Sequence, residues 1–469
     1  MYDQYLKNIK EKLKNNMDII YRDILCHRGL VTLIFSNAIT DKDFISHYIV
    51  SPIVEHDREI INVNVIKDKI LFSSSVGEVP SFEDCIFRIL SGDVILIFDF
   101  SQKVIFCEAK LLAERALERP LNDPVSKGSQ EGFNETINNN ISLLRKRIKS
   151  PLLKIENLQL GIESKTTVAI IYMDGKAPVD LIDLIRTKIT NLRVDFIIDT
   201  NIIEEELKCK DTNFDTIGYT EKPDVVVSRL FEGRVAVMVD GCPTAITAPS
   251  FILGNFQSPE DYYLNKNTAD IIRGIRLMSF AITMYLPGFY VALFTHHLSL
   301  IPQIYVFRSA ESRSGVPLPI VIEVLVMLFF FELTRETGKR LPPSIGQPVS
   351  IIASLILGQA AIGAGLASDG TIIVMGVYAI TSYINPKLSA ATPTWTVLCI
   401  VMSALFGLHG FFIFNFVTIA TISSLNSCGY PYLFPFGTAI KHTFKGGDYF
   451  SRGWLNQISS RLFQSGEKH

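Results

Sequence analysis

The chain has 469 residues, of which 48% are hydrophobic and 20% charged, and its formal net charge at pH 7 is -2. This near-neutral charge and the lack of a long basic tract argue against a general nucleic-acid-binding protein. The mean hydropathy of +0.27 is high for a purely soluble protein. Residues 1 to about 270 carry most of the charge and 277–425 carry little. The composition therefore predicts a water-soluble region followed by a membrane domain.

The cysteine pattern and the absence of known motifs exclude further classes of protein and site. The seven cysteines are scattered, odd in number and without a CxxC pair, which indicates reduced thiols rather than a disulfide framework or a zinc site. P-loop, GxGxxG, GxSxG and HExxH motifs are absent, so we expect no enzyme activity, cofactor or metal. The N-terminus lacks the apolar stretch of a cleavable signal, so we expect the first half to be cytoplasmic.

The first region predicts a small α/β subdomain over residues 1–120. A polar helix is expected over 1–22, and strands over Leu30–Phe35, Val94–Asp99 and Lys103–Cys107. A polar segment with Pro120 and Pro124 then marks a linker.

A second α/β subdomain is expected over 121–262. After a helix near Glu131–Lys149, a strand at Val168–Tyr172, a helix at Val179–Ile189 and a strand at Val194–Ile198 alternate. This order predicts a βαβ unit with a parallel strand pair.

That subdomain is expected to end in a β-hairpin. Val235–Val239 is a compact apolar run, Asp240-Gly241 is a tight-turn dipeptide, and Thr244–Thr247 can return as a second strand. Because Pro243 lacks a backbone donor, we expect the returning strand at a sheet edge.

A helix start follows the hairpin. Ser258 is a suitable N-cap, Pro259 suits the first helical position, and Glu260 and Asp261 suit the positive end of the helix dipole. We expect this helix to enter the bilayer. The candidate residues for coupling between the two regions are Asp240, Gly241, Ser258, Pro259, Glu260 and Asp261.

Residues 263–427 predict an α-helical polytopic membrane domain, with a cytoplasmic tail over 428–469. The expected spans are Leu277–Leu298, Val316–Leu333, Val349–Leu366, Thr371–Ile384 and Thr394–Leu425. Basic residues before the first span, after the second and in the tail favour the inside at both ends, which requires an even number of crossings. Either the short fourth segment is re-entrant, or the fifth is a hairpin broken near Gly407.

Two features suggest an ion pathway. Glu323 is a carboxylate within a span, where it faces either a pathway or a partner, or else lies at the interface. Ser350, Ser354, Gly358, Ala361 and Gly365 form a small-residue stripe on one helix face. Such a stripe favours close helix packing, although it can also line a narrow pore.

Several segments together resemble the A subunit of the GerA-type nutrient germinant receptors of endospore-forming bacteria. They are GSQEGFNETINNNISLLRKRI from residue 128, SKTTVAIIYMDG from 164, YTEKPDVVVSRLFEGRVAVMVDGCP from 219, FQSPEDYY from 256, and LPPSIGQPVSIIASLILGQAAIGAGL from 341. The matching region runs from residue 128 to about 435, roughly two thirds of the chain, in the family's order.

The resemblance implies a multi-pass protein of the inner spore membrane with its N-terminal domain on the cytoplasmic side. It implies partnership with a transporter-like B subunit and a lipoprotein C subunit, and assembly into a ligand-gated cation channel that triggers germination. The alternative is a secondary transporter or lipid-handling membrane protein with a cytoplasmic regulatory domain. Inverted repeats between groups of spans would favour that alternative.

Overall fold

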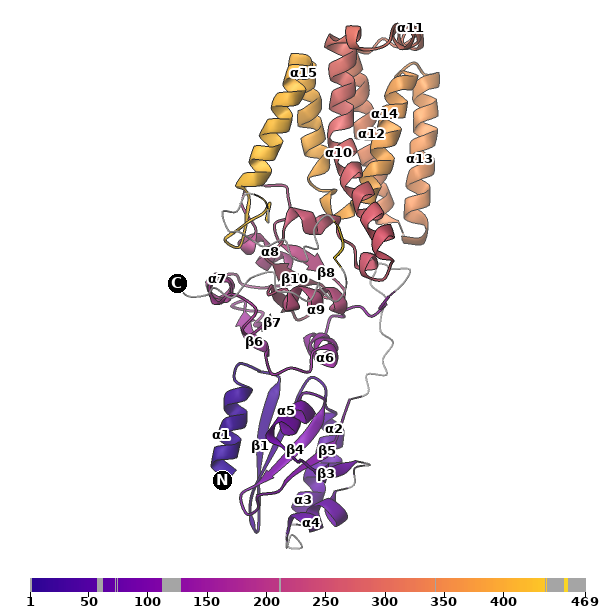
Figure 1. Ribbon diagram of the computed structural model, residues 1–469. Coiled ribbons are helices and arrows are strands. Elements are labelled where there is room, and N and C mark those ends of the chain that lie inside the picture. The colour runs from indigo at the N-terminus through magenta and orange to yellow at the C-terminus, as the bar shows by residue number, and fades with distance from the viewer. Residues whose placement is uncertain are drawn as a thin grey trace.

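The computed structural model describes residues 2–56, 62–71, 73, 75–111, 128–210, 212–341, 343–434, 436 and 451–453. Two α/β subdomains and a helical bundle follow one another along a column, with the N-terminal subdomain at one end and the bundle at the other (Figure 1). This arrangement confirms an α/β N-terminal region followed by a helical region. The part of the expected linker that contains Pro120 and Pro124 lies outside the described residues, as does most of the tail.

The first subdomain is built around a five-stranded antiparallel sheet of order β1-β2-β4-β5-β3. Its elements are α1 (Tyr2–Lys12), β1 (Ile19–Cys26), β2 (Gly29–Ser36), α2 (Lys42–Phe44), η1 (Ile45–Val50), α3 (Ser51–Glu55), α4 (Val63–Val65), η3 (Ile66–Ile70), β3 (Val76–Glu78), α5 (Phe82–Ile89), β4 (Asp93–Phe98) and β5 (Val104–Glu108). The three predicted strands are confirmed. The predicted helix over 1–22 is too long, because β1 begins at Ile19.

Helices cover both faces of this sheet. Ile95 and Ile97 of β4 pack with α1 and α5, whereas Val94, Leu96 and Phe98 pack with the short helices between β2 and β3. Alternate residues of a strand point to opposite faces, so a strand buried on both sides must be apolar throughout.

The second subdomain repeats this topology. Its elements are α6 (Ile137–Arg147), β6 (Leu153–Leu160), β7 (Thr166–Met173), α7 (Val179–Thr190), α8 (Asn201–Leu207), β8 (Gly218–Thr220), α9 (Pro223–Phe231), β9 (Val235–Val239) and β10 (Ala245–Ala248). The sheet order β6-β7-β9-β10-β8 matches that of the first sheet strand for strand, and all its ladders are antiparallel. The two subdomains are therefore structural repeats.

The predicted βαβ unit is wrong. The strand and helix are present as β7 and α7, but Val194–Ile198 forms no strand, and β7 pairs antiparallel with β6 and β9. Helices on both faces make β7 apolar throughout, which imitates a parallel strand. The β9–β10 hairpin is confirmed, although β10 lies inside the sheet rather than at its edge, because Pro243 belongs to the turn.

A buried ion pair joins the two subdomains. Arg145 of α6 lies 2.9 Å from Asp18, with side-chain exposures of 0% and 3%, and donates to Asn16 at 2.7 Å. Lys154 of β6 donates to the carbonyl oxygen of Lys14 at 2.8 Å. The segment between α1 and β1 is thus fixed to the start of the second repeat.

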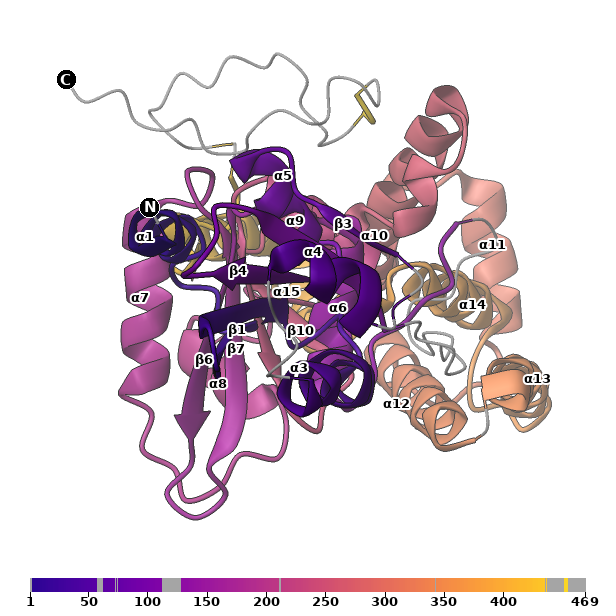
Figure 2. The same cartoon turned by 90° about the horizontal axis from the view of Figure 1, so that it is seen from below.

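The helical region contains short helices and five long ones. They are η4 (Ile252–Phe256), η5 (Pro259–Tyr262), α10 (Lys266–His296), η6 (Leu298–Leu300), α11 (Gln303–Ser312), α12 (Ile320–Arg340), α13 (Pro343–Gly363), α14 (Asp369–Ile384), η7 (Pro386–Leu388) and α15 (Thr392–Ser424). Among the described residues, α10 and α15 are long and apolar enough to cross a membrane, and α14 and the 348–363 part of α13 are shorter apolar helices. Viewed along the long axis, α12, α13 and α14 lie to one side of the α/β subdomains (Figure 2).

The α15 segment is a hairpin rather than one straight helix. Gly407 has φ 59° and ψ -138°, outside the helical region. The rings of Trp395 and Phe414 are 6.0 Å apart, whereas 19 residues of continuous helix would separate them by about 28 Å. Of the two options left open by the sequence, the hairpin is therefore the one observed. Its arms, of about 15 and 17 residues, each rise roughly 22–26 Å.

After α15 the chain returns to the second subdomain. The strands β11 (Asn426–Ser427) and β12 (Tyr430–Pro431) form a small hairpin, and Cys428 joins the core beneath α7 and α8. Tyr432 is fully buried and donates to the carbonyl oxygen of Asp215 at 3.0 Å. The expected boundary at residue 428 thus falls inside a docked segment.

Candidate functional site

The chain between β10 and α10 forms the junction between the second subdomain and the bundle. Ser258 begins the single 3-10 turn η5, with a capping box in which its backbone N–H donates to Asp261 Oδ2 at 3.1 Å. This capping agrees with the sequence signal. However, the long helix begins only at Lys266, so the prediction that Ser258 starts the membrane helix is wrong.

Asp261 is the centre of this junction and has no exposed surface. Arg273 Nε donates to its carboxylate at 2.9 Å, and Arg276 Nη1 lies 2.8 Å from both carboxylate oxygens. Both arginines belong to the first turns of α10. Arg452 Nη1 donates to the backbone carbonyl oxygen of Asp261 at 2.8 Å. We call these four residues the Asp261 cluster.

The Asp261 cluster is connected to both modules. On the subdomain side, Tyr263 donates to Asp224 of α9 at 2.9 Å, and burial raises the pKa of this tyrosine above its ordinary value. On the bundle side, Asn385 Nδ2 donates to the carbonyl oxygen of Arg276 at 2.8 Å. A displacement of η5 would therefore disturb contacts of α9, α10 and the α14–α15 turn together.

The other two coupling candidates lie elsewhere. Asp240 and Gly241 form the turn of the β9–β10 hairpin, at the opposite end of β10 from η4. Asp240 Oδ1 accepts from the backbone N–H of Ile137 at 3.0 Å and so caps α6. Gly241 has φ +91°, a conformation that glycine adopts without strain. The structure thus separates the six predicted residues into two groups.

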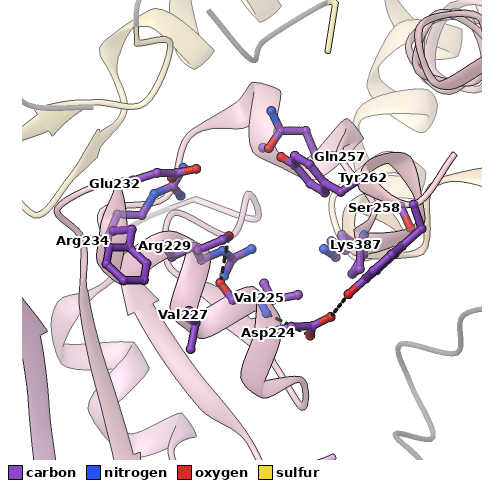
Figure 3. Close-up of a pocket in the computed structure, with 15 residues that line it drawn as sticks. Asp224, Val225, Val227, Arg229, Glu232, Arg234, Gln257, Ser258, Tyr262 and Lys387 are labelled. Atoms are coloured by element: carbon purple, nitrogen blue, oxygen red, sulfur yellow. Dashed lines mark hydrogen bonds and ion pairs between the residues drawn. The ribbon is translucent and has the colours of Figure 1, made fainter. Parts of the chain in front are cut away.

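A pocket lies between α9 and the η4–η5 segment (Figure 3). Its cavity volume is about 410 Å³. The lining residues include Asp224, Val225, Arg229, Phe231, Glu232 and Arg234 on one wall, and Gly254, Gln257, Ser258, Pro259, Tyr262, Tyr263 and Lys387 on the other. Two of the predicted coupling residues, Ser258 and Pro259, therefore line a cavity.

Glu323 is fully buried near the end of the bundle distant from the α/β subdomains. Its Oε2 accepts from the backbone N–H and the hydroxyl of Ser368 at 3.0 and 2.9 Å, and from the Thr371 hydroxyl at 2.9 Å. Arg313 Nη2 lies 3.2 Å from its other oxygen. Glu323 therefore stabilises the N-terminus of α14, where a negative charge is favourable.

The small-residue stripe of α13 faces neighbouring helices. Ser350 Oγ donates to the carbonyl oxygen of Thr334 at 3.0 Å, and Ser354 Oγ lies 3.2 Å from the Thr334 hydroxyl. A Cβ on Gly358 would lie 3.3 Å from Ile372. Ala361 is buried, but the prediction that Gly365 belongs to the helical stripe is wrong, because α13 ends at Gly363 and Gly365 has φ +66°. In this subunit the stripe brings α13 against α12, and Ser354 and Gly358 also line a cavity of about 410 Å³ between α12, α13 and α14.

The sequence did not reveal the partners of these carboxylates. In the sequence, Arg273 and Arg276 count only as basic residues before the first span, and Arg452 as one of those in the predicted cytoplasmic tail. Arg313 carries no distinguishing signal. The spacing of Arg273 and Arg276 on one face of a helix, shortly after Asp261, was the available signal. No group of metal-ligating side chains occurs among the residues that the structure describes.

The chain is similar to known proteins over most of its length. The model of the family described as "Bacillus/Clostridium GerA spore germination protein" matches residues 7–462. Spore germination protein KA of Bacillus subtilis (strain 168) is 31% identical over 92% of this chain and 81% of that protein. GerLA of Bacillus cereus is 30% identical over 94% and 91%.

Two further proteins are similar. The membrane protein YfkQ of Bacillus subtilis (strain 168) is 32% identical over 91% of this chain and 85% of that protein. The crystal structure of the N-terminal domain of the A subunit of the Bacillus megaterium receptor GerK3 matches 53% of this chain and 94% of that domain, at 26% identity and a TM-score of 0.41. The extent of the family match settles the classification: this chain belongs to the GerA spore germination protein family.

Proposed function

We propose that this chain is the A-type membrane subunit of a nutrient germinant receptor, and that it oligomerises into a ligand-gated cation channel. Membership of the GerA family and the names of its relatives support a role in spore germination. The transporter-like B subunit and the lipoprotein C subunit are the proposed partners. The function proposed is signalling and ion conduction, not catalysis.

The proposed location is the inner spore membrane, with the α/β subdomains on the cytoplasmic side. Counting the two arms of α15 separately, the bundle would make six passes and return the chain to its starting side. The basic residues Arg335, Lys339, Arg340 and Lys387 lie at the bundle base, the end next to the second subdomain, as the positive-inside rule favours.

The Asp261 cluster is the proposed coupling element, and its geometry is the observation that carries the mechanism. The buried Asp261 carboxylate accepts from Arg273 and Arg276 of α10, the first helix of the bundle. The backbone carbonyl oxygen of Asp261 accepts from Arg452, in the chain that follows α15. Because a buried charge tolerates few alternative arrangements, such a cluster favours two discrete states over gradual deformation. Ligand binding in a partner subunit would bias these two states.

Glu323 and the stripe of Ser350, Ser354, Gly358, Ala361 and Gly365 remain the proposed ion pathway. In the structure Glu323 is neutralised by Arg313, and Ser350 and Ser354 of the stripe contact Thr334 of α12. We therefore assign this arrangement to the closed channel. Opening would separate α13 from α12 and present Glu323 to the pathway, where a ring of carboxylates would attract cations.

Reconstitution tests this function. The chain would be incorporated into planar bilayers with its B and C partners, and current would be recorded as nutrients are added. Discrete cation-selective current steps are expected. Steady substrate flux without unitary steps would instead support a transporter, and absence of both would reject the channel.

A further inference from the structure

The pocket between α9 and η5 has the composition of a ligand site. It lies where the second subdomain meets the bundle base, and its volume of about 410 Å³ falls within the range of small-molecule sites. One wall comes from α9 and the residues after it. The other comes from η4, η5 and Lys387 of η7, so any bound molecule would touch both modules (Figure 3).

The charges of the lining favour an anion. The lining carries three cationic side chains, Arg229, Arg234 and Lys387, and two carboxylates, Asp224 and Glu232. Both carboxylates already have cationic neighbours: Glu232 lies 2.9 Å from Arg234, and Asp224 lies 3.5 Å from Lys222. The lining, together with the fully buried Lys222 beside it, therefore has an excess of positive charge.

Arg234 adds an independent observation. Its side chain is almost completely buried, and its Nη1 donates to the carbonyl oxygen of Pro249 at 3.3 Å. Within the described part of the chain, its Nε has no hydrogen-bond partner. A buried guanidinium nitrogen without an acceptor is costly, and an anionic oxygen or a water held by one would satisfy it.

The remaining lining is largely apolar. Val225, Phe231, Pro259 and the ring of Tyr262 provide this surface. We propose that the pocket binds an amphipathic anion, with its phosphate or carboxylate head among Arg234, Arg229 and Lys387 and a short apolar chain along α9. Such a ligand comes from one of two sources, a soluble anionic metabolite or the headgroup region of an anionic lipid at the bundle base.

Bound there, the ligand would hold α9 against η5 and so regulate the Asp261 cluster. This regulatory consequence rests on the proposed coupling function, whereas the binding itself does not. Binding can therefore be measured on the purified protein without any channel assay.

The test is calorimetric titration of the full-length chain, in uncharged maltoside micelles, with hexyl phosphate. Inorganic phosphate represents the head alone and hexanol the apolar chain alone. Each is expected to bind at least about tenfold more weakly than hexyl phosphate. Arg229→Gln and Lys387→Gln are each expected to weaken hexyl phosphate binding by about tenfold or more. Lys339→Gln, also at the bundle base but outside the pocket, is the matched control and should bind as wild type.

A second variant fills the cavity without changing a charge. A Cβ at Gly254 would meet no atom within 4 Å, so Gly254→Leu should fold and occlude the pocket. It is expected to abolish binding. If wild-type protein does not bind hexyl phosphate, or if Gly254→Leu and Lys387→Gln bind it as wild type does, the proposal is overturned.

Vesicles distinguish the two sources. The protein would be titrated in phosphatidylcholine vesicles with and without phosphatidylglycerol. Weaker hexyl phosphate binding to the wild-type protein in vesicles that contain phosphatidylglycerol than in phosphatidylcholine alone would support the pocket and identify a lipid headgroup. Hexyl phosphate binding that phosphatidylglycerol leaves unchanged would support the pocket and identify a soluble ligand. Absence of nutrient-evoked current with binding retained would reject the channel and leave the pocket standing.

Discussion

Arg276 Nη1 lies 2.8 Å from both carboxylate oxygens of Asp261, although the two residues belong to different elements. Asp261 is in the 3-10 turn that leaves the second subdomain, and Arg276 is in the third turn of α10. The contact fixes the direction in which α10 leaves the junction. It also explains why the acidic residue at this turn is buried rather than solvated.

Asp261→Asn should destabilise the full-length protein. The substitution keeps the side-chain volume but leaves Arg273 and Arg276 buried without their counter-charge, which typically costs about 3–5 kcal/mol. Thermal unfolding in detergent, followed by tryptophan fluorescence, would measure the loss. Glu336→Gln removes an exposed carboxylate at the bundle base and serves as the control. An unchanged melting temperature for Asp261→Asn would contradict the assigned role.

Arg145→Met should weaken the contact between the two α/β repeats and lower the free energy of unfolding. Removing one member of the buried Arg145–Asp18 pair leaves an uncompensated carboxylate, with an expected loss of about 3–5 kcal/mol. Arg145→Met combined with Asp18→Leu should recover much of this loss, because apolar replacement of both partners is often tolerated. Urea unfolding of wild type, Arg145→Met and the double variant would show the recovery. A double variant no more stable than Arg145→Met would indicate that packing rather than charge dominates.

Glu204 should make stability fall as pH rises. Burial, and next the nearby Asp215, raise the pKa of this carboxyl from 4.5 to about 7. Between these values the folded state binds more protons than the unfolded state, so the free energy of unfolding decreases towards neutral pH, by at most about 3 kcal/mol. Glu204→Gln should flatten the dependence of unfolding free energy on pH and stabilise the protein above pH 7. Glu205→Gln, at the exposed neighbouring residue, controls for the loss of a negative charge. A slope that survives in Glu204→Gln would refute the assignment.

Gly407→Ala should strain the tip of the α15 hairpin. A Cβ there would lie 2.7 Å from a ring carbon of His297 and 2.8 Å from Cβ of His296, and φ of 59° already disfavours an L side chain. The expected loss is about 1–3 kcal/mol. Gly376→Ala, within α14 and with no atom within 4 Å of its Cβ, should be neutral or stabilising. The difference between the melting temperatures of the two variants measures the strain at the hairpin turn. Equal melting temperatures would argue against a tight turn.

Glu323→Gln should alter cation permeation while leaving the oligomer assembled. Glutamine can still bond to Ser368 and Thr371 but cannot attract cations or neutralise Arg313. Reversal potentials in mixed salts would measure the change in selectivity, with Glu311→Gln as the control. Identical selectivity in correctly assembled Glu323→Gln receptors would remove Glu323 from the ion pathway.

Local signals in the sequence predicted local structure well. The β9–β10 turn, the cap at Ser258 and the possible break at Gly407 each depend on a few adjacent residues with distinctive backbone preferences. The pairing of strands was less accessible, because β7 is buried on both faces in an antiparallel sheet and has no alternating pattern. β1 was missed for a related reason: Arg22 and Asp23 interrupt its apolar run.

The contacts of the candidate site depend on residues far apart in the chain. Asp261 and Arg452 are 191 residues apart, and Glu323 meets Ser368 only after α13 has intervened. The position of Glu323 in a predicted span indicated a pathway, a partner or an interfacial position, but did not distinguish among them. The repeated α/β topology could not be predicted either, because the two subdomains share an order of strands in the sheet, which the sequence does not state directly.

Nutrient-triggered cation release from spores tests the coupling role of Asp261 most directly. Spores carrying wild type, Asp261→Asn or Glu336→Gln would be compared at matched amounts of assembled receptor. The account predicts that wild type and Glu336→Gln release cations on nutrient addition, and that assembled Asp261→Asn receptors do not. Normal release by Asp261→Asn would contradict it.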